Sequence, residues 1–523
     1  MIQTKSNCDV LLVGYEDEEN LGLRSMASFL VEKGIDVEIL PCQNVSKEGI
    51  LKQINKRNPK IIGFSLIFQR MIFDFAELID YLRNNGVKSH FTIGGHFPTL
   101  EYEKILELLP GLDTVVRHEG ELTLLDLYRH LKSQSQWSEI RGIAYRRNGA
   151  IEVTSPRPLI QDLNSLPFPV REDKMRDHRG VGVCSILASR GCYYDCSFCS
   201  VQEFYSGAPG PRRRSRSPSN VVKEMEQLFE RGARIFIFKD DDFSMKSRTQ
   251  QRWIDEFSYL LKESGLADQI LWRISCRVDE VDRNMLNKLK TVGLDFLYLG
   301  IESGCEQGLK TCNKHYGVED IYKTLDIIES SRINFEYGFM FFDPDTDLGS
   351  VKDNISFFET LCKDGRVVVH FTKMFPYVGT QIAHKLRAEG RLEGSIDSPD
   401  YRYKDARIDL LEAFFTDAFH KMLFEPEGLV NKLQYAKFDS VILNKFFSDI
   451  YDAKNYMKSV SHLTKVSNES ILETMRLAAD FIDDHDHVGI IKNWYMLKEL
   501  AEQERYVQDV IGSEVDKLIK IYN

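Results

Sequence analysis

Residues 189–200, SRGCYYDCSFCS, carry Cys192, Cys196 and Cys199 in a C-x3-C-x2-C spacing. Cysteines this close together on one segment can converge on a single inorganic centre. A structural zinc site takes four ligands, often as two separated pairs, and a [4Fe–4S] cube also has four irons to ligate. The sequence has no second C-x2-C and no histidine near the three cysteines. The spacing therefore favours an iron–sulfur cube with one open iron over a zinc knuckle completed by a distant residue, or over chance clustering.

The composition bounds the class of protein. A chain of 523 residues with 43% hydrophobic and 28% charged residues is expected to fold into about two to four domains. The net charge of −11 disfavours nucleic acid as a partner, and no apolar run reaches the roughly 18 residues of a membrane span. The start, MIQTKSNCDVLLVG, passes directly into a strand pattern without a leader layout, so we expect reduced thiols in the cytoplasm.

The segment that follows the cysteines alternates apolar strands with amphipathic helices over residues 181–376. Continuous apolar strands joined by helices predict a parallel sheet covered by helices. Polar residues gather where these strands end, which is where functional groups of such barrels lie. The six expected strands lie within residues 181–191, 234–243, 269–279, 295–304, 334–345 and 367–376.

The run C-Y-Y-D-C-S-F-C resembles the signature loop of radical S-adenosylmethionine (SAM) enzymes, whose core is a partial barrel of six β/α units. The resemblance implies that Cys192, Cys196 and Cys199 hold a [4Fe–4S] cluster. In that family the amino and carboxylate groups of SAM bind the open iron, and an electron from the cluster cleaves SAM to a 5′-deoxyadenosyl radical. An external electron donor of the flavodoxin or ferredoxin type is implied as a partner.

The same resemblance extends to the strand ends. The run Asp240–Phe243 is similar to the family's D-D-[ND]-F, and LGIESG at 299–304 is similar to its G-[IVL]-E-S-G. Instead of contacting SAM, the three aspartates could form a solvated acidic turn. Phe198, the residue before the last cysteine, could be an ordinary core aromatic. The DPDT run at 343–346 lacks the second glycine of the family's G-x-P-G-E-T, so the resemblance does not predict the conformation of that turn. The SAM contacts implied are Phe198, Asp241, Ser275, Arg277, Glu302 and Gly338.

The N-terminal segment, residues 8–130, also alternates strands and helices. Its pattern predicts a doubly wound, Rossmann-like α/β domain, which binds ligands at the carboxyl edge of its sheet. The expected strands lie within residues 8–15, 36–42, 60–68, 90–96 and 114–121.

Loops at that edge resemble those of the cobalamin-binding domain fused to many radical SAM enzymes. Ser65-Leu66-Ile67 is similar to its S-x-L element, and glycines at 94–95 permit close approach of the backbone to a ligand. Glu19 stands where related proteins carry a cobalt-ligating histidine, so the resemblance implies base-off cobalamin without a histidine ligand. The alternative is a vestigial domain. The cobalamin contacts implied are Glu19, Gly22, Ser65, Leu66, Gly94, Gly95, His96, Pro98, Glu119 and Gly120.

We therefore expect four parts: a cobalamin-binding domain at 1–150, a proline-containing linker at 151–180, a partial (β/α)6 barrel at 181–393, and a mostly α-helical domain at 394–523. The helical part shows no motif. The arginine-rich loop at 209–218 either meets an acidic substrate or the cobalamin phosphate, or is a solvated loop.

The resemblance implies a cobalamin-dependent radical SAM enzyme that methylates an unactivated carbon of a small-molecule or peptide substrate through methylcobalamin. Alternatives of the same build are a cyclase, a ring-contracting enzyme or an oxidation enzyme. A non-catalytic carrier or regulator that binds cobalamin or a metal is the alternative from another class. No residue is identified from the sequence as a proton donor or base.

Overall fold

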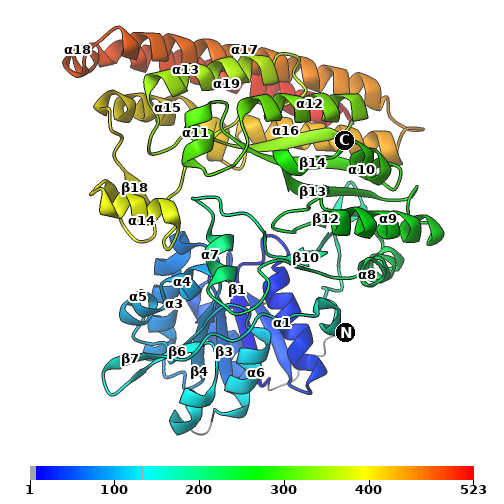
Figure 1. The fold of residues 1–523 in the computed structure, drawn as a ribbon, viewed down its shortest axis with the longest axis vertical. Helices are drawn as coiled ribbons and strands as arrows, with labels where there is room; N and C mark the ends of the chain where they lie inside the picture. Colours follow the sequence, from blue (N-terminus) through cyan, green and yellow to red (C-terminus); the bar gives the residue numbers. More distant parts are fainter. Residues whose placement is uncertain (1–7, 132–133, 523) are drawn as a thin grey trace.

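The computed structural model describes residues 8–131 and 134–522, and these contain two large sheets and a layer of long helices (Figure 1). The first sheet, in blue and cyan, lies at one end of the view, and the second sheet lies between it and the C-terminal helices. Residues 1–7, the start of the segment in which we expect no leader, lie outside the described residues.

The first sheet confirms the doubly wound prediction, because its five N-terminal strands are parallel and helices cover both faces. One face packs on Phe75, Leu78 and Ile105, and the other packs on Leu30 and Leu124. The sheet order is β2 (Val37–Pro41), β1 (Val10–Gly14), β3 (Ile61–Ser65), β4 (His90–Gly94), β5 (Thr114–Val116), β6 (Ile143–Arg147) and β7 (Ala150–Val153). The helices are α1 (Leu21–Glu32), α2 (Lys47–Arg57), α3 (Ile72–Asn84), α4 (His96–Leu100), α5 (Tyr102–Leu108) and α6 (Glu121–Arg129).

The antiparallel hairpin β6–β7 is a feature that the sequence pattern did not predict. β6 pairs with the short edge strand β5, and β7 pairs with β6. The added hairpin covers the edge of β5, which otherwise presents unpaired backbone groups. The segment expected as a linker over 151–180 thus begins inside β7 and includes β8 (Arg176–His178), a strand of the second sheet.

The second sheet has six parallel strands and one antiparallel edge strand. Its edge strands β16 and β8 do not pair with each other, so the sheet is open, as expected for a partial barrel. The order is β16 (Thr372–Lys373), β15 (Asn334–Phe342), β14 (Leu294–Glu302), β13 (Leu271–Arg277), β12 (Ala233–Phe238), β9 (Val181–Ile186) and β8. The main covering helices are α8 (Pro218–Glu230), α9 (Arg248–Glu263), α10 (Arg283–Lys290), α11 (Glu306–Thr311), α12 (Val318–Ser331) and α13 (Leu348–Leu361).

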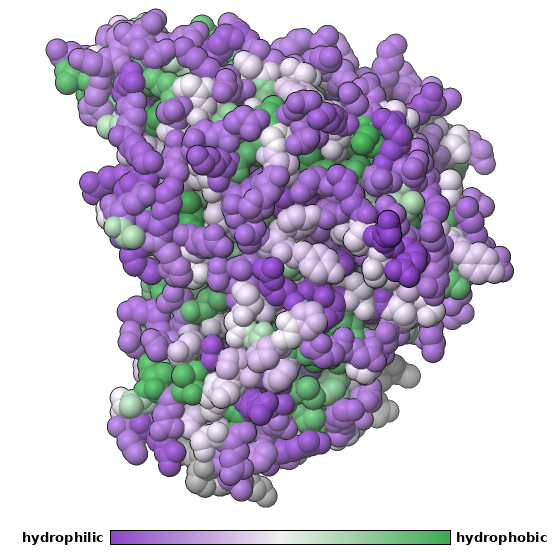
Figure 2. All heavy atoms as spheres, viewed as in Figure 1, coloured by the Kyte–Doolittle hydropathy of each residue, from purple (hydrophilic) through white to green (hydrophobic). Residues whose placement is uncertain are grey.

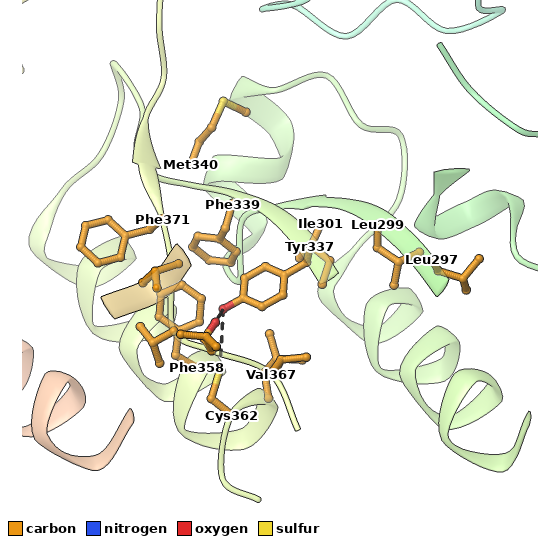
Figure 3. Close-up of a cluster of buried hydrophobic side chains, with 14 of the residues drawn as sticks. Leu297, Leu299, Ile301, Tyr337, Phe339, Met340, Phe358, Cys362, Val367 and Phe371 are labelled. Carbon is orange, nitrogen blue, oxygen red and sulfur yellow. Dashed lines mark hydrogen bonds between the residues drawn. The ribbon is translucent and has the colours of Figure 1, made fainter. Parts of the chain in front are cut away.

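Buried apolar residues alternate with half-buried ones along the central strand β14, although we expected continuous apolar runs. On β14, Leu297, Leu299 and Ile301 are buried in the apolar core, whereas Tyr298 and Glu302 are only half-buried. Figure 3 shows the three apolar side chains in one cluster with residues of β15 and α13. Since successive side chains of a strand point to opposite faces, the other face of β14 is free to present polar groups to the interior.

The C-terminal helices pack on this barrel and share one continuous apolar core with it. The buried Asn468 amide accepts from the Val369 N–H at 2.9 Å and donates to the Cys362 and Val367 carbonyls. The connection to these helices runs through α14 (Gln381–Ala388) and the hairpin β17 (Leu392–Gly394) and β18 (Pro399–Tyr401). The helices are α15 (Ala406–Phe424), α16 (Leu429–Phe446), α17 (Ala453–Asp483), α18 (His487–Lys492) and α19 (Trp494–Tyr522).

One face of the surface and the described helices bear on whether the chain could cross a membrane. Hydrophilic side chains cover most of the face drawn in Figure 2, with hydrophobic ones in small groups. Over the described part of the chain, no helix is both long enough and apolar enough to cross a membrane.

His90, at the start of β4, is a core histidine that is held neutral. Its Nε2 lies 2.9 Å from Thr114 Oγ1 and its ring packs edge-on against Trp137. Burial lowers the pKa of His90 to about 4. Between that value and the ordinary pKa of about 6.5, the unfolded chain binds a proton that the folded chain does not. The stabilisation from this group is therefore complete above pH 6.5 and is lost progressively as the pH falls toward 4.

We predict that His90→Gln flattens the pH dependence of unfolding. The histidine should account for about 1 kcal/mol of the stability lost between pH 7.5 and 5.5, because the unfolded state alone is protonated there. Chemical denaturation of wild type and variant at both pH values measures this difference. The exposed His462 provides the control, since His462→Gln should keep the wild-type slope. A wild-type slope in His90→Gln contradicts the prediction.

Candidate active site

The cysteine loop is held in a conformation that only glycine permits at one point. Gly191 has a φ of +81°, and a Cβ there would stand 1.8 Å from the carbonyl oxygen of Arg212. The flanking strands β10 (Ser189–Arg190) and β11 (Arg214–Ser215) pair antiparallel. The loop therefore leaves β9 and reaches α7 (Ser200–Ser206) with its backbone pressed against the 212–215 segment.

The three cysteines of the loop are half-buried, and their surroundings fit a cluster. Burial raises the pKa of Cys192 to about 12 and of Cys199 to about 11, so a metal must displace their protons on binding. The Arg277 guanidinium lies 3.1 Å from Cys196 Sγ, where it stabilises a thiolate. Among the described residues, no three His, Cys, Asp or Glu side chains are grouped to hold one metal ion.

Ser197, between the second and third cysteines, was missed in the sequence analysis. Its hydroxyl donates to the Thr311 carbonyl at 2.5 Å, its N–H donates to the Cys312 carbonyl at 3.1 Å, and its carbonyl accepts from the Ile382 N–H at 3.0 Å. These bonds tie the middle of the loop to the end of α11 and the start of α14. A serine inside a cysteine motif carries no signal for such long-range contacts.

The three aspartates at the end of β12 bind the loop backbone or its supports. Asp240 accepts from the Ala188 N–H at 3.0 Å, Asp241 accepts from the Gly191 N–H at 2.7 Å, and Asp242 accepts from the Arg277 N–H at 3.2 Å. Burial raises the pKa values of Asp240 and Asp242 to about 6. Asp240 and Asp242 are buried, which excludes a solvated turn for these two, whereas Asp241 is exposed.

A cavity of about 570 Å³ opens beside the cysteine loop inside the barrel. Of the predicted SAM contacts, Phe198, Glu302 and Gly338 line it. Asp241 instead faces the second cavity described below, while Arg277 turns to the cysteine loop. The remaining prediction, Ser275, is half-buried on β13 and does not line either cavity.

Glu302 is held by a buried cation that the sequence analysis did not identify. The residue ends β14 with a φ of +68°, and Lys314 Nζ lies 3.0 Å from its Oε1. Burial opposes the charged form of Lys314, yet the pKa of Lys314 is raised because Glu302 lies so close. The same ammonium lies 5.5 Å from the ring centroid of Phe198. Lys314 therefore orients the carboxylate at the cavity wall.

A second cavity, of about 510 Å³, lies at the carboxyl edge of the first sheet, between it and the cysteine-loop region. Eight of the ten predicted cobalamin contacts line it, and the exceptions are Leu66 and Pro98. Leu66 packs in the apolar core beneath the edge, and a Cβ on Gly95 would stand 2.2 Å from the Leu66 carbonyl oxygen. The eight that line it are Glu19, Gly22, Ser65, Gly94, Gly95, His96, Glu119 and Gly120.

The opposite wall of this second cavity comes from the other domain and was not predicted. α7 lies against α4 (Figure 1) and contributes Phe204 and Tyr205, while Arg190 and Lys239 come from the barrel's strand ends. The His96 ring stacks on Phe204 at 4.4 Å, and burial lowers the pKa of His96 to about 4. This imidazole is therefore neutral at pH 7.

Two predicted cobalamin contacts are engaged in bonds across the domain interface. Glu19 accepts from the Ser185 N–H at 2.5 Å and pairs with Arg171 at 3.0 Å. Glu119 lies 3.1 Å from Arg190 and 2.9 Å from Arg214. Glu19 is therefore held by protein groups at the point where a cobalt-ligating histidine would otherwise be expected.

Three arginines of the arginine-rich loop are buried rather than solvated, whereas residues 209–211 are exposed and Arg212 is half-buried. Arg213, Arg214 and Arg216 are each less than a tenth exposed. Arg214 pairs with Glu119, and Arg216 pairs with Glu224 on α8 at 2.5 Å. The charges of Arg214 and Arg216 are thus engaged in buried pairs, to which arginine is well suited, whereas Arg213 donates to the Asp242 carbonyl at 3.3 Å.

Comparison with known proteins matches both α/β parts of the chain. The B12 binding domain family matches residues 8–128, and the Radical SAM superfamily matches residues 186–358. An uncharacterized methyltransferase, PH0819 of Pyrococcus horikoshii, is 29% identical over 69% of this chain and 77% of its own length. The anaerobic magnesium-protoporphyrin IX monomethyl ester cyclase of Cereibacter sphaeroides is 26% identical over 57% of this chain and 48% of its own length.

A solved structure shares the fold over nearly the whole chain. The cobalamin-dependent S-adenosylmethionine radical enzyme OxsB, with aqua-cobalamin and S-adenosylmethionine bound, superposes with a TM-score of 0.71. The match covers 99% of this chain and 80% of that one, at 18% sequence identity. The C-terminal helices, which no motif explained, are therefore part of a shared architecture.

We predict that Gly191→Ala loses most of its iron after anaerobic reconstitution, because the new methyl group must displace the 212–215 segment. Gly180→Ala is the matched control, since Gly180 has a φ of +77° with no heavy atom within 4 Å of an added Cβ. Both variants carry the positive-φ strain of about 1 kcal/mol, but only the first carries the clash. Iron and sulfide content per chain, with thermal unfolding, measures the difference. Equal iron in the two variants contradicts the prediction.

Proposed function

The chain belongs to the Radical SAM superfamily and carries a B12 binding domain, and from this premise we propose that it is a cobalamin-dependent radical SAM methyltransferase acting on an unactivated carbon. The observation that supports the proposal is that Phe68 lines both cavities. A substrate beside the cysteine loop would therefore lie next to the ligand of the first domain.

The residues present fit the three cofactors of this family. Cys192, Cys196 and Cys199 would hold the [4Fe–4S] cluster, and Phe198, Glu302 and Gly338 would contact SAM. Gly94 and Gly95 expose backbone at the second cavity, where cobalamin would bind without a ligand from Glu19. When bound, the cluster and SAM supply hydrogen-atom abstraction and cobalamin supplies the methyl group.

The roles of the chain's own groups follow from their contacts. Arg277 stabilises the thiolate of Cys196, and Lys314 keeps the Glu302 carboxylate at the cavity wall. The ion pairs of Glu119 hold the first domain against the cysteine-loop region, and so fix the position of one cavity relative to the other. An external donor of the flavodoxin or ferredoxin type would deliver the electron, and the substrate would be a small molecule or a peptide.

A second candidate function is cyclisation, since one relative is named as a cyclase. Equal amounts of S-adenosylhomocysteine and 5′-deoxyadenosine per turnover would support methyl transfer. Formation of 5′-deoxyadenosine without S-adenosylhomocysteine would favour cyclisation or oxidation instead.

We expect protein reconstituted with iron, sulfide and hydroxocobalamin to hold about four irons and one cobalt and to form 5′-deoxyadenosine from SAM under reduction. Cys199→Ala should lose both iron and SAM cleavage. Cys184→Ala is the control, because Cys184 is buried in β9 outside the cysteine loop, and it should keep both.

Three results would overturn parts of this proposal. Zinc in place of iron would contradict the radical mechanism. Iron without cobalt would contradict the assignment of cobalamin as the methyl carrier. Full metal content without SAM cleavage would favour a non-catalytic carrier or regulator.

A further inference from the structure

The wall of the barrel cavity includes a short segment of the first domain, Phe68–Arg70. Gln69, at its centre, is 2% exposed and is held at both ends of its amide. Its Nε2 donates to the Ile396 carbonyl at 2.7 Å and its Oε1 accepts from the Val378 N–H at 2.9 Å. Two bonds to two different segments fix the backbone here, so the neighbours Phe68 and Arg70 are held at the cavity.

Part of the cavity wall is aromatic. Phe375 and Tyr377 follow β16, with ring centroids 4.6 Å apart, and Phe68 lies 6.4 Å from Tyr377. Phe424, at the end of α15, completes this wall. Phe68 and Phe424 are 48% and 54% exposed. Large exposed apolar side chains around a cavity usually mark a binding site. The four rings come from the first domain, the barrel and the C-terminal helices.

The charges of the lining are compensated, with one exception. Glu302 pairs with Lys314, and Lys373 pairs with Asp400 at 2.5 Å and Glu412 at 3.3 Å. His370 is neutral at pH 7, because burial lowers its pKa. Within the described ranges, Arg70 is the charged side chain of the lining for which no ion pair is found. The cavity therefore offers one uncompensated positive charge beside an aromatic surface.

We propose that the substrate of this site is an apolar, ring-containing molecule that carries one anionic group, with its apolar body against Phe68, Phe375, Tyr377 and Phe424 and its anion on Arg70. The anion is a carboxylate or a phosphate, both of which arginine binds through paired N–H donors. This inference rests on the proposed function, since it assigns the substrate class of the same cavity.

Binding to the reconstituted holoenzyme with SAM present tests the proposal. The probes are 1-naphthaleneacetate, 1-naphthyl phosphate and the uncharged 1-naphthaleneacetamide, compared by isothermal titration calorimetry. We expect at least one anion to bind about fivefold to tenfold more tightly than the amide, the gain of a charge-assisted pair that the ligand covers. The stronger of the two anions identifies the carboxylate or phosphate class.

Two variants separate the charge from the aromatic surface. Arg70→Gln should abolish the preference for the anion and leave amide binding unchanged, whereas Phe424→Ala should weaken all three probes. Arg248→Gln, on the exposed start of α9, is the matched control and should bind like wild type.

Equal affinity of wild type for anions and amide would overturn the proposal. So would an Arg70→Gln variant that loses SAM affinity and keeps its anion preference, because Arg70 would then serve the SAM carboxylate. Iron, cobalt and SAM cleavage are measured on the same preparation. If the protein holds both metals and cleaves SAM but shows no preference for an anion, this inference alone is wrong. If it does not hold the metals or cleave SAM, the proposed function is wrong.

Discussion

Carboxylates at the end of β12 hold the backbone of the cysteine loop, and much of the site depends on this contact. Asp240 and Asp241 accept N–H groups from the segment before Cys192, and Asp242 accepts the N–H of Arg277. Arg277 in turn lies against Cys196. The strand of one β/α unit thus positions a loop from the preceding unit and a cation from the next. Such a chain of bonds leaves little freedom for the thiols, because each partner is itself fixed by a strand end.

The interface between the two α/β domains includes several buried charge pairs. Glu119 joins Arg190 and Arg214, and Glu19 joins Arg171 and a backbone N–H of β9. Removing one partner of such a pair leaves a buried charge without compensation, which costs several kcal/mol. The pairs therefore tolerate few relative orientations of the two domains. This constraint explains why Arg214 is buried although the composition of its loop is that of a solvated one.

The sequence predicted the parts of the molecule that depend on local pattern. The alternation of strands and helices predicted both sheets, whereas the role of Cys192, Cys196 and Cys199 as cluster ligands, inferred from their spacing, stays a prediction. Residues that act through tertiary contacts gave no signal. Lys314 lies in an unremarkable turn, and Gln69 contacts a carbonyl 327 positions away. Leu66 and Pro98 illustrate the reverse error, since a motif places its residues near an edge without saying which side chains turn into the core.

Gln69 also changes what the first domain does for the enzyme. Its amide joins the loop after β3 to the barrel's last strand end and to the segment before β18, so one wall of the barrel cavity is made by the domain that binds the second cofactor. The barrel alone therefore does not form the complete cavity. A substitution in the loop after β3 would therefore change the wall of the barrel cavity without any change in the barrel itself.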